Sequence, residues 1–503
     1  MRGRYWLLCT TATITCLSIA GGVRAGPITL VDVIPNAASA ETQQNSEPSI
    51  GVNPNDPNQL ISGAFTALFS PPPTNVTTPY WISNNGGTTW SGFGSLQTLD
   101  KSIAFNGSTP LTATLNGVGG VNNQIQTFSS INGTSFNNNL NNFNPPARLD
   151  QPWIRTGPSN HVYVGYNNLS NFGGGNGKTA TINVSTNGGM TYTPKVIETV
   201  TPTSGQDAPS IREAVNGNTV YAVFTRWNNQ VSNTGGGLRF ASQEIVVKST
   251  DGGATFSAGT QVATPISPFT QTDNTSLSVG AERVGSDNAI AVDPNNANHV
   301  VVAYVDTPAI GQMQVHVAES TDGGLTWANK LTTPLATRSA QPALTITENG
   351  DTALVYNNYN PQTDKLSQHL VTTTDDFATT TETILATENN STSGGPAIQF
   401  DPYVGDFFDL TSIGNILYGI FSASNADNGI LGSFLAGTEF QRNFVGTPGA
   451  ASFALRDLGN NPVAFSVDPF FFTVDLTAIP EPGTLILLGT SLLGLAALLR
   501  RRS

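Results

Sequence analysis

The sequence predicts an all-β protein built from repeated units of short strands, and three observations lead to this prediction. Only 11% of the 503 residues are charged, 38% are hydrophobic, and Asn, Ser, Thr and Gly dominate the polar remainder. This balance suits short strands joined by many turns, and it is poor in the residues that favour helices. In addition, one octapeptide recurs along the chain, and a second, strand-like pattern precedes it.

The octapeptide reads Ser, any residue, Asp or Asn, any residue, Gly, any residue, Thr and an aromatic residue. Full copies cover residues 83–90, 185–192, 249–256 and 320–327, with Asn85, Asn187, Asp251 and Asp322 at the third position. Degraded copies cover 129–136, with Ile131 at that position, and 373–380, with Phe377 in place of the glycine. An Asp or Asn that accepts backbone hydrogen bonds, followed by a glycine with positive φ, is typical of a tight hairpin turn.

The second pattern predicts two strands joined by an Asx-Pro turn. It is clearest in residues 50–62 and 290–302, where an apolar run leads through Asn-Pro or Asp-Pro to another apolar run. The two patterns together define seven units, near residues 48–90, 108–136, 150–192, 206–256, 283–327, 339–380 and 401–445. Residues 28–33 and 463–476 are further strand candidates that could close a ring.

The octapeptides resemble Asp boxes, also called BNR repeats, which occur in sialidases and many other β-propellers. The resemblance implies four-stranded blades around a central channel, with each box between the third and fourth strands, on the face opposite the ligand site. Asn85, Asn187, Asp251 and Asp322 would then be structural turn residues. We therefore expect residues 26–479 to form a β-propeller of seven blades, with six blades, the number in sialidases, as the alternative because the second unit is short.

Both ends of the chain read as export signals. Residues 1–25 combine a basic start, an apolar run and a small residue, Ala25, at a cleavage position, as a signal peptide does. Residues 480–503 run from Pro480-Glu481-Pro482 through an apolar stretch, long enough to span a membrane as a helix, to Arg500-Arg501-Arg502. This order resembles a PEP-CTERM sorting signal; a plain tail anchor would not explain the Pro-Glu-Pro. The resemblance implies an exosortase as processing partner, transient anchoring in the inner membrane, and a mature protein at the cell surface or outside the cell.

Acidic residues precede the first strand of several units, where loops enter the channel of a propeller. They are Glu47, Asp150, Asp207, Asp287, Asp401 and Asp406. A ring of carboxylates raises the pKa values of its members or attracts a cation, and hard oxygen ligands suit Ca²⁺ or Mg²⁺. The alternative is that each carboxylate caps backbone N–H groups in its own loop. No other metal site or cofactor is predicted, because the four histidines lack metal-ligand spacing.

The charge and the missing motifs narrow the function. Without its two ends the chain carries 15 basic and 33 acidic residues, a net charge of −18 that would repel nucleic acid, and it has no cysteine. The resemblance to sialidases implies an arginine clamp, but no Arg-Ile-Pro occurs, and Arg155, Arg212, Arg338 and Tyr403 match no family motif. We expect a surface or matrix propeller that binds a glycan, such as extracellular polysaccharide, or another envelope component without catalysis. The alternatives are a glycoside hydrolase or lyase at the channel mouth, and a purely structural coat protein.

Overall fold

The computed structural model describes most of the segment between the two predicted export signals. The described residues are 26–38, 44–67, 77–98, 100–116, 124–143, 149–168, 179–199, 206–207, 211–232, 238–269, 287–309, 311–389, 404–424, 434–441, 444–445, 454–455 and 467–477. The predicted signal peptide and sorting helix lie outside them. The part of the chain that is described contains no helix with the length and apolar composition that a membrane span requires. Pro27–Asp475 forms one of two compact units, and the following account concerns that unit.

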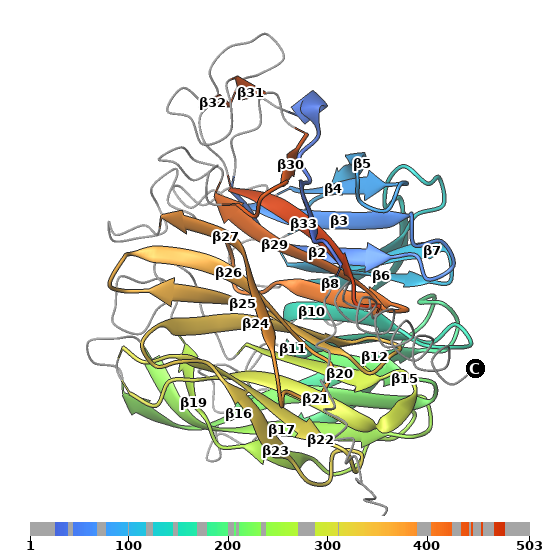
Figure 1. The fold of residues 1–503 in the computed structure, drawn as a ribbon. Coiled ribbons are helices and arrows are strands. Elements are labelled where there is room, and N and C mark those ends of the chain that lie inside the picture. The colour runs from blue at the N-terminus through green and yellow to red at the C-terminus, as the bar shows by residue number, and fades with distance from the viewer. Residues whose placement is uncertain are drawn as a thin grey trace, which may run out of the picture. The chain divides into compact units, whose positions relative to one another are not determined.

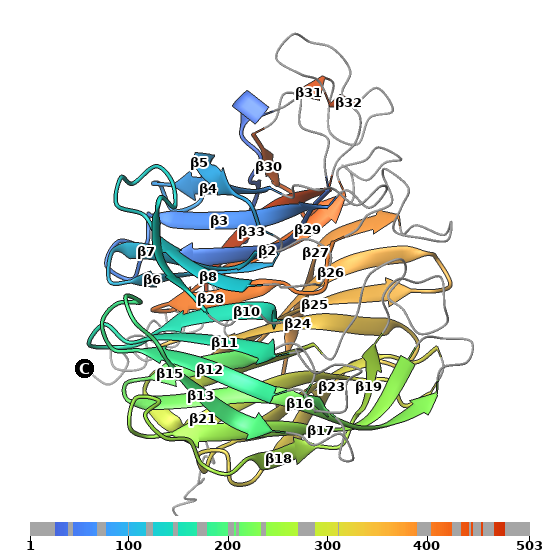
Figure 2. The ribbon, with the colours of Figure 1, turned by 180° about the vertical axis from the view of Figure 1, so that it is seen from behind.

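The unit is a β-propeller of seven four-stranded blades (Figure 1; Figure 2 shows it from behind). Blade 1 contains β2 (Gln44–Val52), β3 (Leu60–Ala67), β4 (Thr78–Ser83) and β5 (Ser91–Leu96). Blade 2 contains β6 (Lys101–Asn106), β7 (Thr109–Asn116), β8 (Gln124–Ser129) and β9 (Asn138–Asn142). Blade 3 contains β10 (Leu149–Thr156), β11 (Val162–Asn168), β12 (Thr179–Ser185) and β13 (Thr193–Thr199).

The next three blades follow the same antiparallel order. Blade 4 contains β15 (Arg212–Asn216), β16 (Thr219–Ser232), β17 (Leu238–Ser249) and β18 (Thr260–Ala263), and the short β14 (Gln206–Asp207) and β19 (Ile266–Phe269) add to it. Blade 5 contains β20 (Asn288–Asp293), β21 (Asn296–Asp306), β22 (Gln314–Ser320) and β23 (Ala328–Thr332). Blade 6 contains β24 (Arg338–Ile346), β25 (Thr352–Asn360), β26 (Lys365–Thr373) and β27 (Thr381–Asn389).

Blade 7 closes the ring with strands from both ends of the unit. It contains β28 (Asp409–Ile413), β29 (Ile416–Ser424), β33 (Val467–Asp475) and, as its fourth strand, β1 (Thr29–Asp32). The predicted seventh unit ended at residue 445, but the third strand lies further along the chain and the fourth comes from the N-terminal side. The antiparallel pairing of β1 with β33 matches the strand candidates expected to close the ring. A 3-10 turn η1 (Asn36–Ala38), β30 (Glu439–Phe440), β31 (Phe444–Val445) and β32 (Ala454–Leu455) complete the elements.

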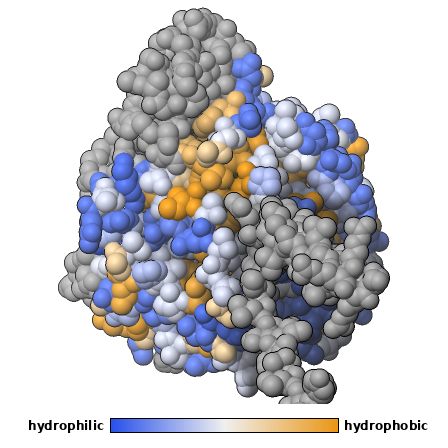
Figure 3. Space-filling model, in the orientation of Figure 1, coloured by the Kyte–Doolittle hydropathy of each residue, from blue (hydrophilic) through white to orange (hydrophobic). Residues whose placement is uncertain are grey.

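The hydrophobic core lies between adjacent blades. One buried cluster joins Leu111 and Ile125 of blade 2 to Ile154 and Val162 of blade 3, and comparable clusters join other neighbouring blades. The first strands contact one another in the order β2, β6, β10, β15, β20, β24, β28 and back to β2, so they surround the channel. On the face in Figure 3, hydrophobic residues gather near β29 and β33, among described residues that are otherwise largely hydrophilic.

Each octapeptide forms the turn between the third and fourth strands of its blade. In blade 5 the Ser320 hydroxyl donates to Asp322 (2.8 Å), and the N–H of Thr326 donates to the same carboxylate oxygen (2.9 Å). The Gly323 N–H donates to the carbonyl of Asn298 (2.9 Å), in the hairpin between the first and second strands. Octapeptide turns and these hairpins therefore lie at one end of the blades, named here the turn end; the opposite end is the channel mouth.

The degraded octapeptides also form turns, with one change of alignment. In blade 6 Asp375 accepts the N–H of Thr379 (2.8 Å), as its counterparts do in the full copies. In blade 2 Asn132, and not the residue at 131, accepts the N–H of Ser135 (3.1 Å), and Ser130 accepts the N–H of Gly133 (3.1 Å). The turn in blade 2 is thus shifted by one residue from the sequence alignment.

Candidate functional site at the channel mouth

Three first strands share a local distortion where they enter the channel. Glu47, Gln151 and Gln341 each precede a proline and have positive φ values of 52°, 46° and 56°. The strand register shifts at each of these positions. An extra residue in a left-handed conformation is the mark of a β-bulge, which redirects the following side chains. The bulges therefore set which side chains of β2, β10 and β24 face the channel.

The bulges introduce buried amides as well as carboxylates. Gln151 donates from Nε2 to the carboxylate of Asp406 (3.1 Å), and Gln341 donates from Nε2 to the carbonyl of Gly405. Both glutamines are buried. Asp150, which was predicted at the mouth, lies one residue before the bulge. The sequence signal of the bulges is the Glu-Pro or Gln-Pro pair that three units share at their start.

A small cavity of about 20 Å³ lies at the centre of the mouth. Its lining comes from the start of five blades and includes Trp153, Arg212, Glu213, Asp287 and Asp406. A cavity of this size holds about one water molecule.

Two arginines flank one tryptophan in this cavity. The guanidinium carbon of Arg212 lies 4.0 Å from the ring centre of Trp153, and that of Arg155 lies 4.5 Å from it. Arg155 also forms an ion pair with Asp409 (3.2 Å). Cation–π contacts of this kind stabilise desolvated arginines and hold them in fixed positions. Trp153 is only 5% exposed.

Lys101 supplies a third positive charge beside the cavity. Its ammonium donates to the carbonyl of Glu47, lies 5.6 Å from the ring centre of Phe407, and is fully buried. Burial lowers the pKa of Lys101 to about 8, although the nearby carboxylates, Glu47 foremost, act in the opposite direction. Burial likewise lowers the pKa of Arg212 to about 10. The positive charges reduce the acidity expected from sequence alone.

Glu213 is a buried carboxyl group of the channel that the sequence did not single out. Its carboxyl packs where a side chain at Gly165 would otherwise lie, and neither oxygen has a hydrogen-bond partner among the described residues. Burial raises the pKa of Glu213 to about 8, and the neighbouring Arg155 and Arg212 only partly offset this effect. Glu213 therefore holds a proton near neutral pH, unlike an exposed glutamate. Nothing in its mid-strand sequence context distinguishes it.

The predicted mouth carboxylates have different locations. Asp287 and Asp406 line the same cavity, and both are buried. Glu47 is buried beside Lys101, whereas Asp150 is only partly buried and accepts the N–H of Gln151 (3.1 Å). The side chain of Asp207 and all of Asp401 lie outside the described residues. The structure thus brings two of the six candidates together in one cavity.

Arg338, which matches no family motif, lies outside the lining of this cavity and donates from Nε to the carbonyl of Gly311 (3.2 Å). Trp227 also lies outside the lining and stacks on Phe240 with ring centres 4.4 Å apart. Tyr403 lies outside the described residues. The third octapeptide positions are at the turn end. The pKa of Asp251 is lowered to about 2, mainly by the hydrogen bonds that it accepts from Thr255. Equivalent hydrogen bonds from Thr326 lower the pKa of Asp322.

A larger hollow of about 410 Å³ opens the same channel at the turn end. Its wall combines aliphatic residues, among them Val215, Val292 and Ile346, with polar and charged ones. Arg155 and Glu213 line both this hollow and the mouth cavity, so they lie between the two.

The comparisons with known proteins identify one segment of the chain. Residues 478–502 match the family described as the PEP-CTERM protein-sorting motif. The chain carries a PEP-CTERM sorting motif. This motif implies export, a membrane-anchored precursor and processing by an exosortase. The match includes the predicted signal residues on either side of the apolar stretch, which are Pro480, Glu481, Pro482, Arg500, Arg501 and Arg502. These six residues are not among those that the structure describes.

Solved structures resemble the propeller in fold alone. A protein of unknown function from Dyadobacter fermentans is 12% identical with a TM-score of 0.45, over 91% of this chain and 100% of that one. An ulvan lyase, solved with a bound saccharide, is 11% identical with a TM-score of 0.47, over 76% and 92%. An α-L-arabinofuranosidase from Fusarium graminearum is 11% identical with a TM-score of 0.42, over 66% and 93%. A search of curated proteins finds no match to this chain.

Proposed function

We propose that this protein is an exported surface or matrix propeller that binds a glycan or another cell-envelope component at its channel mouth without catalysis. The sorting motif supports delivery to the envelope. The octapeptide turns, which we interpret as Asp boxes, stabilise hairpins at the turn end. They do not take part in the channel mouth, where we place ligand binding. Extracellular polysaccharide is the ligand class that the location and the polar mouth favour.

The observation that carries this proposal is the small size of the cavity that two of the mouth carboxylates share. A glycoside hydrolase needs two carboxyl groups about 5–10 Å apart with room for the sugar and, in inverting enzymes, a water between them. Asp287 and Asp406 share a cavity of about 20 Å³, and Gln151 donates to Asp406. Fixed aromatic, guanidinium and amide groups around so small a space favour recognition at the rim over cleavage inside.

Glycoside hydrolysis is the second candidate, and Glu213 is the observation in its favour. A carboxyl group whose pKa burial raises to about 8 can act as a general acid near neutral pH. It lines the same cavity as Asp287 and Asp406, either of which could serve as the second carboxyl group. Acid–base catalysis of glycoside hydrolysis requires two carboxyl groups in one site.

Binding and turnover assays on the purified, processed protein separate the two candidates. We expect polysaccharide from the producing cells to bind in a pull-down and by calorimetry, with no release of reducing ends and no turnover of a fluorogenic sialoside. W153F should weaken binding at least fivefold, because Trp153 positions both arginines, while W227F, which alters a tryptophan outside the cavity, should not. Turnover that is lost in both E213Q and D406N would replace the binding proposal with the hydrolase.

A further inference from the structure

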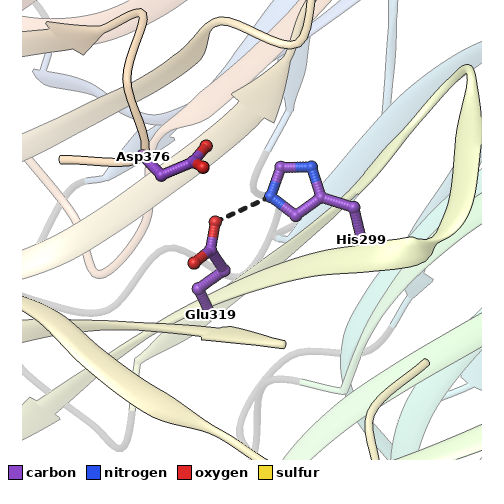
Figure 4. Close-up of side chains that lie close together, drawn as sticks. All are labelled: His299, Glu319 and Asp376. Carbon is purple, nitrogen blue, oxygen red and sulfur yellow. Dashed lines mark hydrogen bonds and ion pairs between the residues drawn. The ribbon is translucent and has the colours of Figure 1, made fainter. Parts of the chain in front are cut away.

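A histidine and two carboxylates from neighbouring blades meet at the turn end. His299 lies in β21, Glu319 in β22, and Asp376 in the octapeptide turn after β26 (Figure 4). One potential ligand atom of each lies within 4.8 Å of the others. His299 and Glu319 are buried, at 8% and 5% exposed, while Asp376 is exposed at the edge of the group.

The surroundings of His299 resemble the support that proteins give to a metal-bound imidazole. Nδ1 of His299 faces the carboxylate of Asp293 (3.1 Å), and Nε2 points to Glu319 (2.9 Å). A carboxylate on one ring nitrogen fixes the tautomer and leaves the other nitrogen to the metal. Asp293 is not one of the three candidate ligands, so it is an independent observation in favour of a metal site.

Glu319 can serve two cations at once. Its second carboxylate oxygen pairs with the ammonium of Lys330 (2.5 Å), while the first faces His299. Lys330 therefore holds the glutamate in place without occupying the oxygen that points into the cluster.

We propose that His299, Glu319 and Asp376 bind one divalent transition-metal ion, with Zn²⁺ as the reference ion, and that this ion links blades 5 and 6. One imidazole and two carboxylates, completed by water, form a donor set suited to Zn²⁺, whereas Ca²⁺ and Mg²⁺ favour oxygen ligands alone. Ligand atoms in a tetrahedral zinc site are about 3.3 Å apart, given bonds of about 2.0 Å. The exposed Asp376 side chain can close the remaining gap.

The sequence of blade 6 changes at the position that contributes the third ligand. Four other octapeptide turns have glycine there: Gly86, Gly188, Gly252 and Gly323. In blade 6 the residue is Asp376, with a φ of 53° that glycine would adopt more readily. An aspartate thus occupies a position whose backbone conformation favours glycine, and its side chain faces the histidine of the preceding blade.

The same protein contains a matched position without the ligands. His161 follows Asn160 in the hairpin of blade 3, as His299 follows Asn298 in blade 5, and both asparagine carbonyls accept a glycine N–H from an octapeptide turn. The position equivalent to Asp376 is Gly252, where an added Cβ would lie 3.1 Å from Nε2 of His161. The position equivalent to Glu319 is Val184. His161 therefore has the place of a ligand but no carboxylate at these two positions.

Titration of the purified, metal-free protein with ZnCl₂, followed by calorimetry and thermal unfolding, tests the proposal. We expect one Zn²⁺ per chain and a higher unfolding temperature with metal. D376N, at an exposed turn position that Asn tolerates, should weaken binding at least tenfold, and H299Q should abolish it. H161Q should bind as the wild type does. Cobalt in place of zinc should give visible absorption bands that D376N alters.

The variants also distinguish this three-residue site from loose binding of ions to the acidic surface. Wild-type protein that binds neither Zn²⁺ nor Co²⁺ would overturn the proposal. Equal binding by wild type, D376N and H299Q would do the same, because the ion would then sit elsewhere on the protein. Since D376N changes only an exposed side chain, its circular dichroism and unfolding without metal should match those of the wild type, which excludes misfolding as the cause of lost binding.

Discussion

Glu244 places a carboxyl group between blades 4 and 5, where it should make stability depend on pH. It is 1% exposed and accepts hydrogen bonds from the hydroxyl of Thr225 (2.7 Å) and the amide of Asn288 (2.9 Å). Burial raises the pKa of Glu244 to about 8, and these two hydrogen bonds offset the effect only in part. The perturbation is E244Q, which keeps the shape, can accept from Asn288, can donate to Thr225, and cannot ionise.

The sign follows from the two pKa values. In the unfolded chain the carboxyl ionises near its ordinary pKa of about 4.5, whereas in the folded protein it stays protonated until about 8. Between these values the folded state holds a proton that the unfolded state has released, so stability falls as pH rises. At 1.36 kcal/mol per pKa unit, the loss from pH 5 to pH 8 is at most about 3.5 kcal/mol, and roughly half of that if water enters the site.

Denaturant unfolding of wild type and E244Q at pH 5, 6, 7 and 8 measures this loss. We expect the free energy of unfolding of E244Q minus that of wild type to increase by about 2 kcal/mol from pH 5 to pH 8, because only the wild type loses stability as the pH rises. E348Q, which removes an exposed carboxylate, should run parallel to the wild type. Parallel curves for E244Q and wild type would refute the reasoning, because they would mean that Glu244 ionises at the same pH in both states.

Two further predictions concern the turns and the mouth. G87A should destabilise the protein by about 3 kcal/mol or more in denaturant unfolding, because the new Cβ would lie 2.0 Å from the ring of Phe471 at a φ of 87°. G133A, at a φ of 68° with open space around it, should cost only about 1 kcal/mol. Equal losses in the two variants would contradict this account. K101M should lower the free energy of unfolding by about 3 kcal/mol, because it removes the buried cation beside Glu47. Adding E47Q to K101M should restore part of this loss. A double variant that is less stable than K101M would contradict this interaction.

Sequence reasoning predicted the blades well because each blade carries its own local signals. The octapeptides fix where the third strand turns into the fourth, and the Asx-Pro pattern fixes the hairpin before it. Blade 7 was the exception in its boundaries. It has no octapeptide, its third strand follows a long segment after β29, and its fourth strand, β1, comes from the other end of the unit. Strands so far apart along the chain leave no local pattern that reveals their pairing.

The channel mouth was predicted in position but not in detail, for a reason that lies in the bulges. Side chains alternate along a strand, so one inserted residue moves every later side chain to the other face. In this way Gln151, and not the predicted Asp150, contributes the buried side chain at the start of β10. Lys101 and Glu213 were missed for a different reason: a single charged residue within a strand-like run gives no indication of whether it faces solvent, a neighbouring blade or the channel.

Recurrence around the ring distinguishes scaffold from candidate site. In blade 5 Tyr304 stacks on His316, and in blade 6 Tyr356 stacks on His369, each with ring centres 5.1 Å apart. A pair that recurs at the same blade position serves the packing of that position. His299 does not fit this pattern, because its counterpart His161 keeps the place in the hairpin but has Val184 and Gly252 where His299 has Glu319 and Asp376. The carboxylates are therefore not required by the hairpin, and their presence beside only one of the two histidines is the physical reason to look for an ion there.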